Sequence, residues 1–280
     1  MESIIKINLM KNIVKLSQQI IRRHKIKLDP ERTRLFGKLI LLIKKGDANM
    51  TNSVLLKKID IIKLRQVFSI EQMSIEKYWS QKIISSKNPL SEISLFPFYH
   101  GYVSMARYLY DTIIAISHKP IKKILYIGAG ALPLNSILIA QNHNLKIDNI
   151  EREYESFKLS RLLLHRLKLD NRIKVIHKDI LDFKKMKDYD VIICAILVGD
   201  NTKQKQRVIN HIGKYMRFGN LLLLKNIDGL RTLLYPPIFT ARFLKNLSVE
   251  AIHKKQSELT NILIVAKKVA KNDKNFSEND

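Results

Sequence analysis

The chain has 280 residues, of which 46% are apolar and 8% aromatic, and its formal net charge is +25. This composition excludes an intrinsically disordered chain and predicts one large domain or two modest ones, while the single cysteine, Cys194, excludes an intrachain disulfide and a zinc-finger spacing. No segment approaches the roughly 18 apolar residues of a membrane helix or the apolar core of a signal peptide, so we expect a cytoplasmic protein without a transmembrane segment.

The first third of the chain has the periodicity of amphipathic helices, with lysines and arginines between the recurring apolar residues. The pattern predicts helices over residues 4–21, 31–45, 52–64, 70–85 and 98–117. Gly46 favours the end of the second helix, and Asn52 or Ser53 is a candidate cap of the third. Pro89 interrupts the pattern after the fourth helix, and His118 closes the fifth.

After Pro120, short β-type runs alternate with helical patterns. The predicted strands cover residues 122–128, 145–151, 172–179, 189–197, 219–226 and 261–269. The predicted helices between them cover residues 132–142, 155–167 and 203–216. This alternation predicts the α/β class, with a Rossmann-type doubly wound parallel sheet. We therefore expect a helical N-terminal domain at 1–118, a Rossmann-type domain at 119–270 and a disordered tail at 271–280.

The ends of the predicted strands carry the residues of a cofactor site. Gly128 and Gly130 follow the first strand, where glycine lets the backbone approach a ligand at the start of the next helix. Pro133 stands where a dinucleotide fingerprint has its third glycine, which counts against NAD. Glu151 ends the second strand, where an acid can hold ribose hydroxyls, and Asp179 follows the third, within reach of an adenine edge. This combination is typical of S-adenosylmethionine sites; the alternative is a glycine turn beside ordinary surface acids.

Six segments between about residues 70 and 268 resemble, in order, the motifs of the nicotianamine synthase family. NPLSEISLFPFYHGY is similar to its NPL, LFPYY and NY pattern, GAGALPLNSILIA to GSGPLPLTSI, and ICAILVG to AALVG. Further along, HIGKYM is similar to HLGAHM, DGLRTLLYP to HGARGFLYP, and ELTNILIVAKK to the closing strand of the family. The basic first 65 residues carry little of this resemblance.

The resemblance implies an S-adenosylmethionine-dependent transferase fold and a specific reaction. The 3-amino-3-carboxypropyl (aminobutanoyl) group of S-adenosylmethionine moves to an amine, methylthioadenosine leaves, and no metal ion is needed. The expected product is a nicotianamine-type metal chelator or an opine-type metallophore. The small amino-acid acceptor stays open between another aminobutanoate unit, glutamate and histidine. Three departures from the family pattern leave it open: Glu151 replaces an aspartate, Gly101 an asparagine, and Ala131 a proline.

The resemblance also implies roles for individual residues. Glu76 falls where the family has its general base, and Tyr102 where it has the tyrosine beside the reacting amine; read alone, they are an exposed helix glutamate and a core aromatic. Ala195 and Leu197 are expected to join the glycine loop in cofactor binding. Arg231 suits bidentate recognition of a carboxylate, or else forms a surface ion pair. The predicted substrate contacts are Tyr99, His100, Arg231 and Tyr235.

Two other functions compete with this transfer reaction. A methyltransferase acting on RNA is motivated by the cofactor fold and the net charge. However, CAILVG stands where amino-methylating enzymes often have an NPPY-type motif, and the sequence shows no basic motif with interleaved aromatic residues for binding RNA. A coding bias of an AT-rich genome also produces a high positive net charge. The third possibility is a non-catalytic protein that senses S-adenosylmethionine. The basic N-terminal helices are left open between wrapping the first domain, forming a homodimer and touching a membrane surface.

Overall fold

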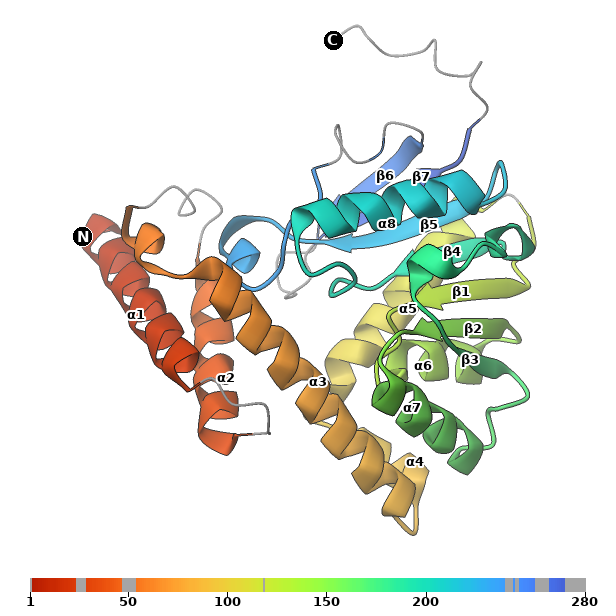
Figure 1. The fold of residues 1–280 in the computed structure, drawn as a ribbon, viewed down its shortest axis with the longest axis horizontal. Coiled ribbons are helices and arrows are strands. Elements are labelled where there is room, and N and C mark those ends of the chain that lie inside the picture. Colours follow the sequence, from red (N-terminus) through yellow and green to blue (C-terminus); the bar gives the residue numbers. More distant parts are fainter. Residues whose placement is uncertain are drawn as a thin grey trace, which may run out of the picture.

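The computed structural model describes residues 2–23, 29–46, 54–117, 119–239, 244, 247–254 and 262–269. Within these residues, a seven-stranded sheet is covered by helices and joined to an N-terminal helix pair (Figure 1). The helices are α1 (Glu2–Arg22), α2 (Pro30–Lys45), α3 (Ile61–Ser85), α4 (Pro89–Ser94), α5 (Tyr99–Ile116), α6 (Leu134–Asn142), α7 (Tyr154–Arg166) and α8 (Thr202–Tyr215). The strands are β1 (Lys123–Ile127), β2 (Lys146–Glu151), β3 (Ile173–His177), β4 (Val191–Cys194), β5 (Leu221–Asn226), β6 (Ser248–Lys254) and β7 (Ile262–Lys267). Short 3₁₀ segments are η2 (Val54–Lys58), η3 (Ile180–Asp182), η4 (Met186–Asp188) and η5 (Gly229–Leu233).

Five parallel strands form the doubly wound part of the sheet, which confirms the predicted α/β class. The strand order is β3-β2-β1-β4-β5-β7-β6, so the chain winds outward from β1 to β3 and then from β4 to β5 in the other direction. Ligands of open α/β sheets bind beyond the carboxyl ends of the strands where the winding reverses, here between β1 and β4. Strand β7 pairs with β5 in the antiparallel sense. Strand β6 was not predicted, because this edge strand carries polar residues and is only partly buried.

The sheet is buried on both faces. Along β1, Ile124 and Tyr126 belong to an apolar layer that also contains side chains of α5, α6 and α7. Leu125 and Ile127 belong to the layer on the other face, with side chains of α8. Successive strand residues point to opposite faces, so a strand covered on both sides reads as a continuous apolar run.

Helix α3 joins the N-terminal helix pair to the sheet. Leu64 and Phe68, in its first half, pack with α1 and α2 in a third apolar cluster that also contains Leu230 from η5. Ile75 and Ile83, in its second half, belong to the core layer on the sheet. The apolar core of the N-terminal helices is therefore shared with the loop after β5. The domain limits at residues 118 and 119 stay a prediction.

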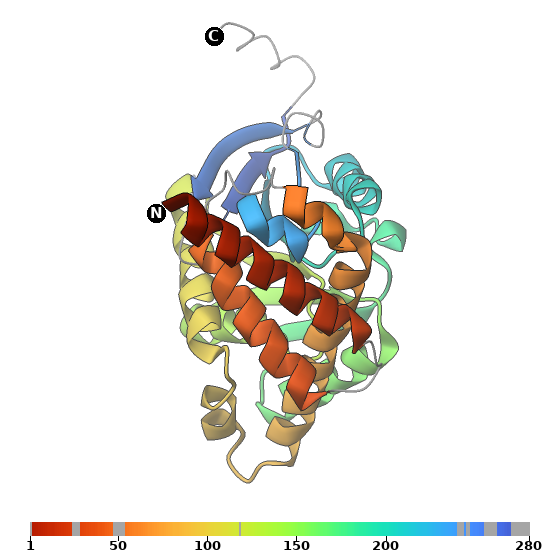
Figure 2. The ribbon, with the colours of Figure 1, turned by 90° about the vertical axis from the view of Figure 1, so that its left-hand side faces the viewer.

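Helices α1 and α2 form a pair on the side of the molecule away from the sheet, where they make up the layer nearest the viewer in Figure 2. A fully buried ion pair ties α2 to α3: Nε of Arg32 donates to Oε2 of Glu71 over 2.6 Å, and both side chains are 0% exposed. The hydroxyl of Thr33 donates to the same carboxylate. None of the described helices combines the length and apolar content that crossing a membrane requires.

Two helical segments differ from the prediction. Residues 61–85 form one continuous α3 in place of separate helices at 52–64 and 70–85, because no glycine or proline interrupts this stretch. Asp60 caps it, accepting a hydrogen bond from the Lys63 amide over 2.9 Å. Pro89 does more than end a pattern: it begins α4, where the missing N–H of proline costs no helix hydrogen bond. The expectations for Asn52, Ser53, His118 and residues 271–280 lie outside the described residues.

Candidate active site

A cavity of about 860 Å³ opens at the carboxyl ends of β1 and β4. Its walls come from α3, the start of α5, the loops after β1 to β4, and one edge of α2. The predicted site residues that line it are Glu76, Tyr102, Gly128, Gly130, Pro133, Glu151, Asp179, Ala195, Leu197 and Tyr235. Pockets of this size enclose a drug-sized ligand, so the cavity has room for one cofactor and a small second substrate.

Three predicted substrate contacts lie outside this lining. The rings of Tyr99 and His100 contact each other at the start of α5, with centroids 5.8 Å apart, and His100 is exposed. Arg231 is 4% exposed and lies within η5, where its backbone carbonyl accepts from the Tyr235 amide over 3.2 Å. Burial lowers the pKa of Arg231. The sequence motif around Arg231 therefore marks a buried segment whose tyrosine, but not whose arginine, faces the cavity.

The loop after β1 needs its two glycines for space as well as for backbone conformation. Gly128 and Gly130 have φ angles of 79° and 70°, in the left-handed region that disfavours side chains. A Cβ atom at Gly128 would lie closer than 3.0 Å to Val198, and one at Gly130 equally close to Oε2 of Glu76. The loop is thus packed directly against the predicted catalytic carboxylate.

The two predicted cofactor acids are both held by backbone amides. Glu151 accepts from the amides of Gly130 and Glu153 over 2.8 Å each, and is 8% exposed. Asp179 caps η3, accepting from the Leu181 amide over 2.8 Å. A carboxylate has about four acceptor positions, so each acid keeps capacity for ligand hydroxyl or amino groups.

Glu76, on α3, lines the cavity with its carboxyl against the glycine loop. Its carboxyl is hydrogen-bonded to the Tyr102 hydroxyl and the Ala131 amide. Burial and the nearby negative charge of Glu151 raise the pKa of Glu76 to about 8, against smaller opposing effects of these hydrogen bonds and of Lys225. Burial and the Glu76 charge raise the pKa of Tyr102 well above its ordinary value, so this hydroxyl stays protonated and donates. The pair therefore supplies a carboxyl whose pKa approaches that of an amine, and the Tyr102 hydroxyl, which stays protonated, holds this carboxyl by a hydrogen bond.

A polar group in the cavity was not foreseen from the sequence. Lys225, at 8% exposure on β5, donates to the Tyr126 hydroxyl over 3.2 Å, and Nδ2 of Asn135 donates to the same oxygen over 2.9 Å. Oδ1 of Asn135 is buried without a hydrogen-bond partner in the described structure. A buried cation and an unsatisfied buried acceptor line the cavity together, and such groups cost free energy unless a ligand pairs with them. The one sequence signal was a lysine directly after the apolar run LLLL of this strand.

The loop after β4 is held in place by hydrogen bonds to α8 and β1. Lys205 is buried and donates to the Ile196 carbonyl over 2.5 Å, and the Ala195 amide donates to Ile127 over 3.0 Å. Burial lowers the pKa of Lys205 to about 8 and raises the pKa of Cys194 to about 11. These contacts hold Ala195 and Leu197 at the cavity, and the thiol of Cys194 is a buried structural group.

The cavity fits a nucleoside cofactor with an amino-acid arm. The glycine loop leaves backbone space beside β1, Glu151 and Asp179 offer acceptors, and Lys225 with Asn135 offers partners for a carboxylate and an ammonium group. Within the described residues, no cluster of three or more His, Cys, Asp or Glu side chains is arranged to hold a metal ion.

Comparison with known proteins gives consistent matches over most of the chain. The family described as nicotianamine synthase protein matches residues 2–273. A nicotianamine synthase of Solanum lycopersicum is 31% identical over 200 residues, which cover 70% of this chain and 62%, less than two thirds, of that protein. Nicotianamine synthase 1 of Arabidopsis thaliana is 26% identical over 92% of this chain and 83% of its own length. The family match begins at residue 2, so it includes the basic first 65 residues, in which the sequence shows few of the family motifs.

Solved structures share the fold. MtNAS in complex with MTA and tNA superposes with a TM-score of 0.79 at 20% identity, over 93% of this chain and 98% of that one. A mutant of MtNAS in complex with S-adenosylmethionine gives a TM-score of 0.78 over the same fractions. Magnesium protoporphyrin IX methyltransferase from Synechocystis PCC 6803 gives 0.53 at 14% identity, over 75% of this chain. The helical N-terminal part and the sheet are thus found together in a known fold.

Proposed function

The chain belongs to the nicotianamine synthase family, and on that premise we propose that it transfers the 3-amino-3-carboxypropyl group of S-adenosylmethionine to the amine of a small amino acid. Methylthioadenosine is the leaving product. The observation that carries this proposal is the position of the Glu76 carboxyl, packed against Gly130 inside a cavity whose loops suit a nucleoside cofactor. Burial there also raises the pKa of Glu76 to about 8. A methyl transfer needs no such base when the acceptor is already nucleophilic, whereas an ammonium acceptor must first lose a proton.

Glu76 acts as the base. An amino-acid amine is mostly protonated near neutral pH, and a carboxyl with a pKa near 8 accepts its proton far more readily than one with a pKa of 4.5. S-adenosylmethionine supplies an activated carbon next to a sulfonium, so the nitrogen lone pair forms the new C–N bond while the C–S electron pair returns to sulfur. Tyr102 holds the Glu76 carboxyl in place through its hydroxyl.

Lys225 and Asn135 recognise the amino-acid part of a substrate. The ammonium group of Lys225 binds an α-carboxylate, and the free Oδ1 of Asn135 accepts from an α-ammonium. Tyr235 lies in the same cavity and is 5% exposed; burial and the charge of Glu76 raise its pKa, so it remains a neutral donor. Glycine residues 128 and 130, with the acids Glu151 and Asp179, hold the nucleoside, together with Pro133, Ala195 and Leu197 on the cavity walls.

The product is a nicotianamine-type chelator or metallophore, and the transfer itself proceeds without a metal ion. The names of the relatives from Solanum lycopersicum and Arabidopsis thaliana support this product class. We also propose the cytoplasmic location expected from the sequence, and a homodimer, which the sequence left open as one of three alternatives. Cell fractionation tests the location, and light scattering of the purified chain tests the homodimer.

The decisive experiment is mass spectrometry of products from the purified chain and S-adenosylmethionine, alone and with glutamate or histidine added. Methylthioadenosine with a product heavier by one or more aminobutanoate units supports the proposal, and its dependence on the added amino acid identifies the acceptor. S-adenosylhomocysteine as the sole product, or only when RNA is present, would identify a methyltransferase. Calorimetric binding of S-adenosylmethionine without turnover would identify a sensor.

Glu76→Gln provides the matched control. Gln has the same shape and still hydrogen-bonds to Tyr102, but it cannot accept a proton from an ammonium group. The variant should bind S-adenosylmethionine with an affinity within a fewfold of the parent chain and lose turnover by roughly 100-fold or more.

A further inference from the structure

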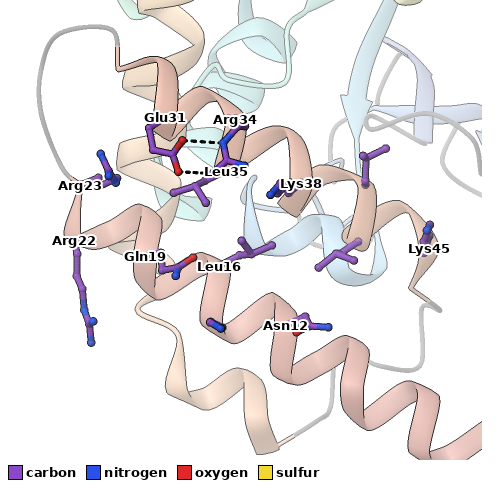
Figure 3. A pocket seen from close by; sticks show the side chains of 13 residues that line it. Asn12, Leu16, Gln19, Arg22, Arg23, Glu31, Arg34, Leu35, Lys38 and Lys45 are labelled. Atoms are coloured by element: carbon purple, nitrogen blue, oxygen red, sulfur yellow. Dashed lines mark hydrogen bonds and ion pairs between the residues drawn. The ribbon is translucent and has the colours of Figure 1, made fainter.

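A second cavity, of about 740 Å³, is lined by side chains of α1 and α2 (Figure 3). These two helices form the layer nearest the viewer in Figure 2. Its apolar lining consists of Leu16, Leu35, Leu41 and Leu42. Its rim is formed by six basic side chains and one acidic side chain: Lys15, Arg22, Arg23, Arg34, Lys38, Lys45 and Glu31. We call this feature the basic groove. None of its residues belongs to the catalytic machinery assigned above, although Leu41 also lines the active-site cavity.

The charges of the basic groove are only partly compensated by the protein. Arg34 binds Glu31 through two hydrogen bonds of 2.8 and 2.6 Å, drawn dashed in Figure 3, and Arg23 lies 3.5 Å from Asp29. The other four basic side chains form no ion pair with any residue that the structure describes: Lys15, Arg22, Lys38 and Lys45. Like charges gathered on one rim repel each other, so the rim is stabilised by an anionic partner.

The same face exposes aliphatic side chains next to the cations. Leu41, on the groove wall, is 61% exposed. Ile4 and Ile5 are 62% and 63% exposed, and they precede the groove residue Asn12 by two helical turns, so they continue its face toward the N-terminus. Exposed aliphatic side chains beside an excess of cations, on a helix that lies along the surface, are the features of an interfacial amphipathic helix.

We propose that the basic groove and the N-terminal turns of α1 form a docking surface for an anionic lipid bilayer. Lys15, Arg22 and Lys38 meet headgroup phosphates, while Ile4 and Ile5 enter the boundary between headgroups and acyl chains. The protein lies on the bilayer and does not span it, in keeping with the absence of a spanning helix among the described residues.

The composition of the surface favours lipid over nucleic acid. Proteins that bind single strands without sequence preference stack bases on aromatic rings, and the lining of the basic groove contains no Phe, Tyr or Trp. A nucleic acid also offers nothing to exposed isoleucines, whereas a bilayer surface accepts both cations and aliphatic side chains.

Co-sedimentation of the full chain with vesicles tests the proposal. The vesicles are phosphatidylcholine alone or with about one quarter phosphatidylglycerol, the composition that gives a negative surface. We expect binding only to the anionic vesicles, strong at low salt and weak near 1 M, where screening reaches within about 3 Å. The triple variant Lys15→Gln, Arg22→Gln and Lys38→Gln should lower the partition coefficient by roughly 100-fold, since each cation near the surface contributes about fivefold.

Matched variants separate the groove from the general charge of the chain. Lys184→Gln, Lys185→Gln and Lys187→Gln remove the same charge from exposed positions around η4 and should leave vesicle binding nearly unchanged. Ile4→Ser with Ile5→Ser should weaken the binding that remains at high salt. Thermal melts of each variant confirm that it is folded.

Three outcomes would overturn the proposal. The first is no sedimentation with anionic vesicles at low salt. The second is an equal loss in the groove and η4 variants, which would assign the binding to net charge. The third is a short RNA that competes fully with vesicles while Ile4→Ser and Ile5→Ser change nothing, which would identify the basic groove as a nucleic-acid surface.

Discussion

Replacing Gly130 by alanine tests whether the glycine loop and Glu76 are built as one unit. The new methyl group would lie closer than 3.0 Å to Oε2 of Glu76, and the residue has a φ of 70°. The carboxylate is the end of a flexible side chain, so the clash is relieved by moving it away from the loop. Gly219→Ala is the matched control, because Gly219 has a φ of 80° and a Cβ there would meet nothing within 4 Å.

The two variants should lose similar stability and different amounts of activity. An L-residue in the left-handed region costs roughly 1–2 kcal/mol, which applies to both positions. A chain of this length then loses roughly 2–8 °C in melting temperature. Only Gly130→Ala displaces the base, and a positioned base contributes roughly 100- to 10,000-fold in rate. We therefore expect kcat of Gly130→Ala to fall by about 100-fold or more, a barrier increase of about 3 kcal/mol.

The assay is the initial rate of methylthioadenosine release, with unfolding followed by circular dichroism. A double variant adds a sharper test: in the Glu76→Gln background, Gly130→Ala should cost almost no further activity, because the two act on the same step. Activity of Gly130→Ala within a fewfold of that of Gly219→Ala would refute the reasoning, as would two fully additive losses. Either result would mean that the loop does not position the base.

Three further predictions follow from the charged groups. Because the pKa of Glu76 is raised from 4.5 to about 8 in the folded state, the free energy of unfolding should fall as pH rises between these two values. Glu76→Gln should remove this pH dependence. In denaturant melts at pH 8 the variant should be more stable than the parent chain by roughly 1–3 kcal/mol, a range discounted for solvent in the open cavity. Lys225→Met should raise KM for an amino-acid substrate by at least about tenfold. It should also raise the pKa of Glu76, so that the ascending limb of the pH–rate profile moves to higher pH. If KM and the pH–rate profile are unchanged, Lys225 does not bind the substrate carboxylate. Arg32→Met should destabilise the fold by about 3–5 kcal/mol, because the buried Glu71 carboxylate loses its charge partner and keeps only the hydrogen bond from Thr33. Arg34→Met, in an exposed pair, should cost at most about 1 kcal/mol, and equal costs in the two variants would contradict this account.

The secondary structure of the sheet region could be read from the sequence because its physical causes are local. Strands buried on both faces are continuous apolar runs, and each ends at a residue whose position relative to the next strand is fixed by the winding of the sheet. The strand ends therefore predict one edge of the sheet for Gly128, Gly130, Glu151 and Asp179, and all four line the cavity there. Strand β6 was not predicted, because a partly exposed edge strand has no such apolar run.

The sequence motifs predicted Glu76 and Tyr102 as site residues, but they did not show which contacts position the two side chains. The same motifs also predicted Tyr99, His100 and Arg231 as substrate contacts, and these three residues do not line the cavity. A motif covers neighbours along the chain, and a helix turns each successive residue to a different side, so membership in a motif does not fix which side chain faces the ligand.

By itself, the sequence determined the α/β class, the strand-end constellation and the family resemblance. Only the tertiary structure decided which distant groups meet: Glu76 of α3 against the loop after β1, and Lys225 of β5 beside Asn135 of α6. It also decided that the lysines of α1 and α2 gather around one groove. The physical reason is that periodicity reports which face of an element is buried, whereas the pairing of faces depends on packing between elements far apart in the chain. The burial and the nearby negative charge of Glu151 that raise the pKa of Glu76 exist only after that packing is complete.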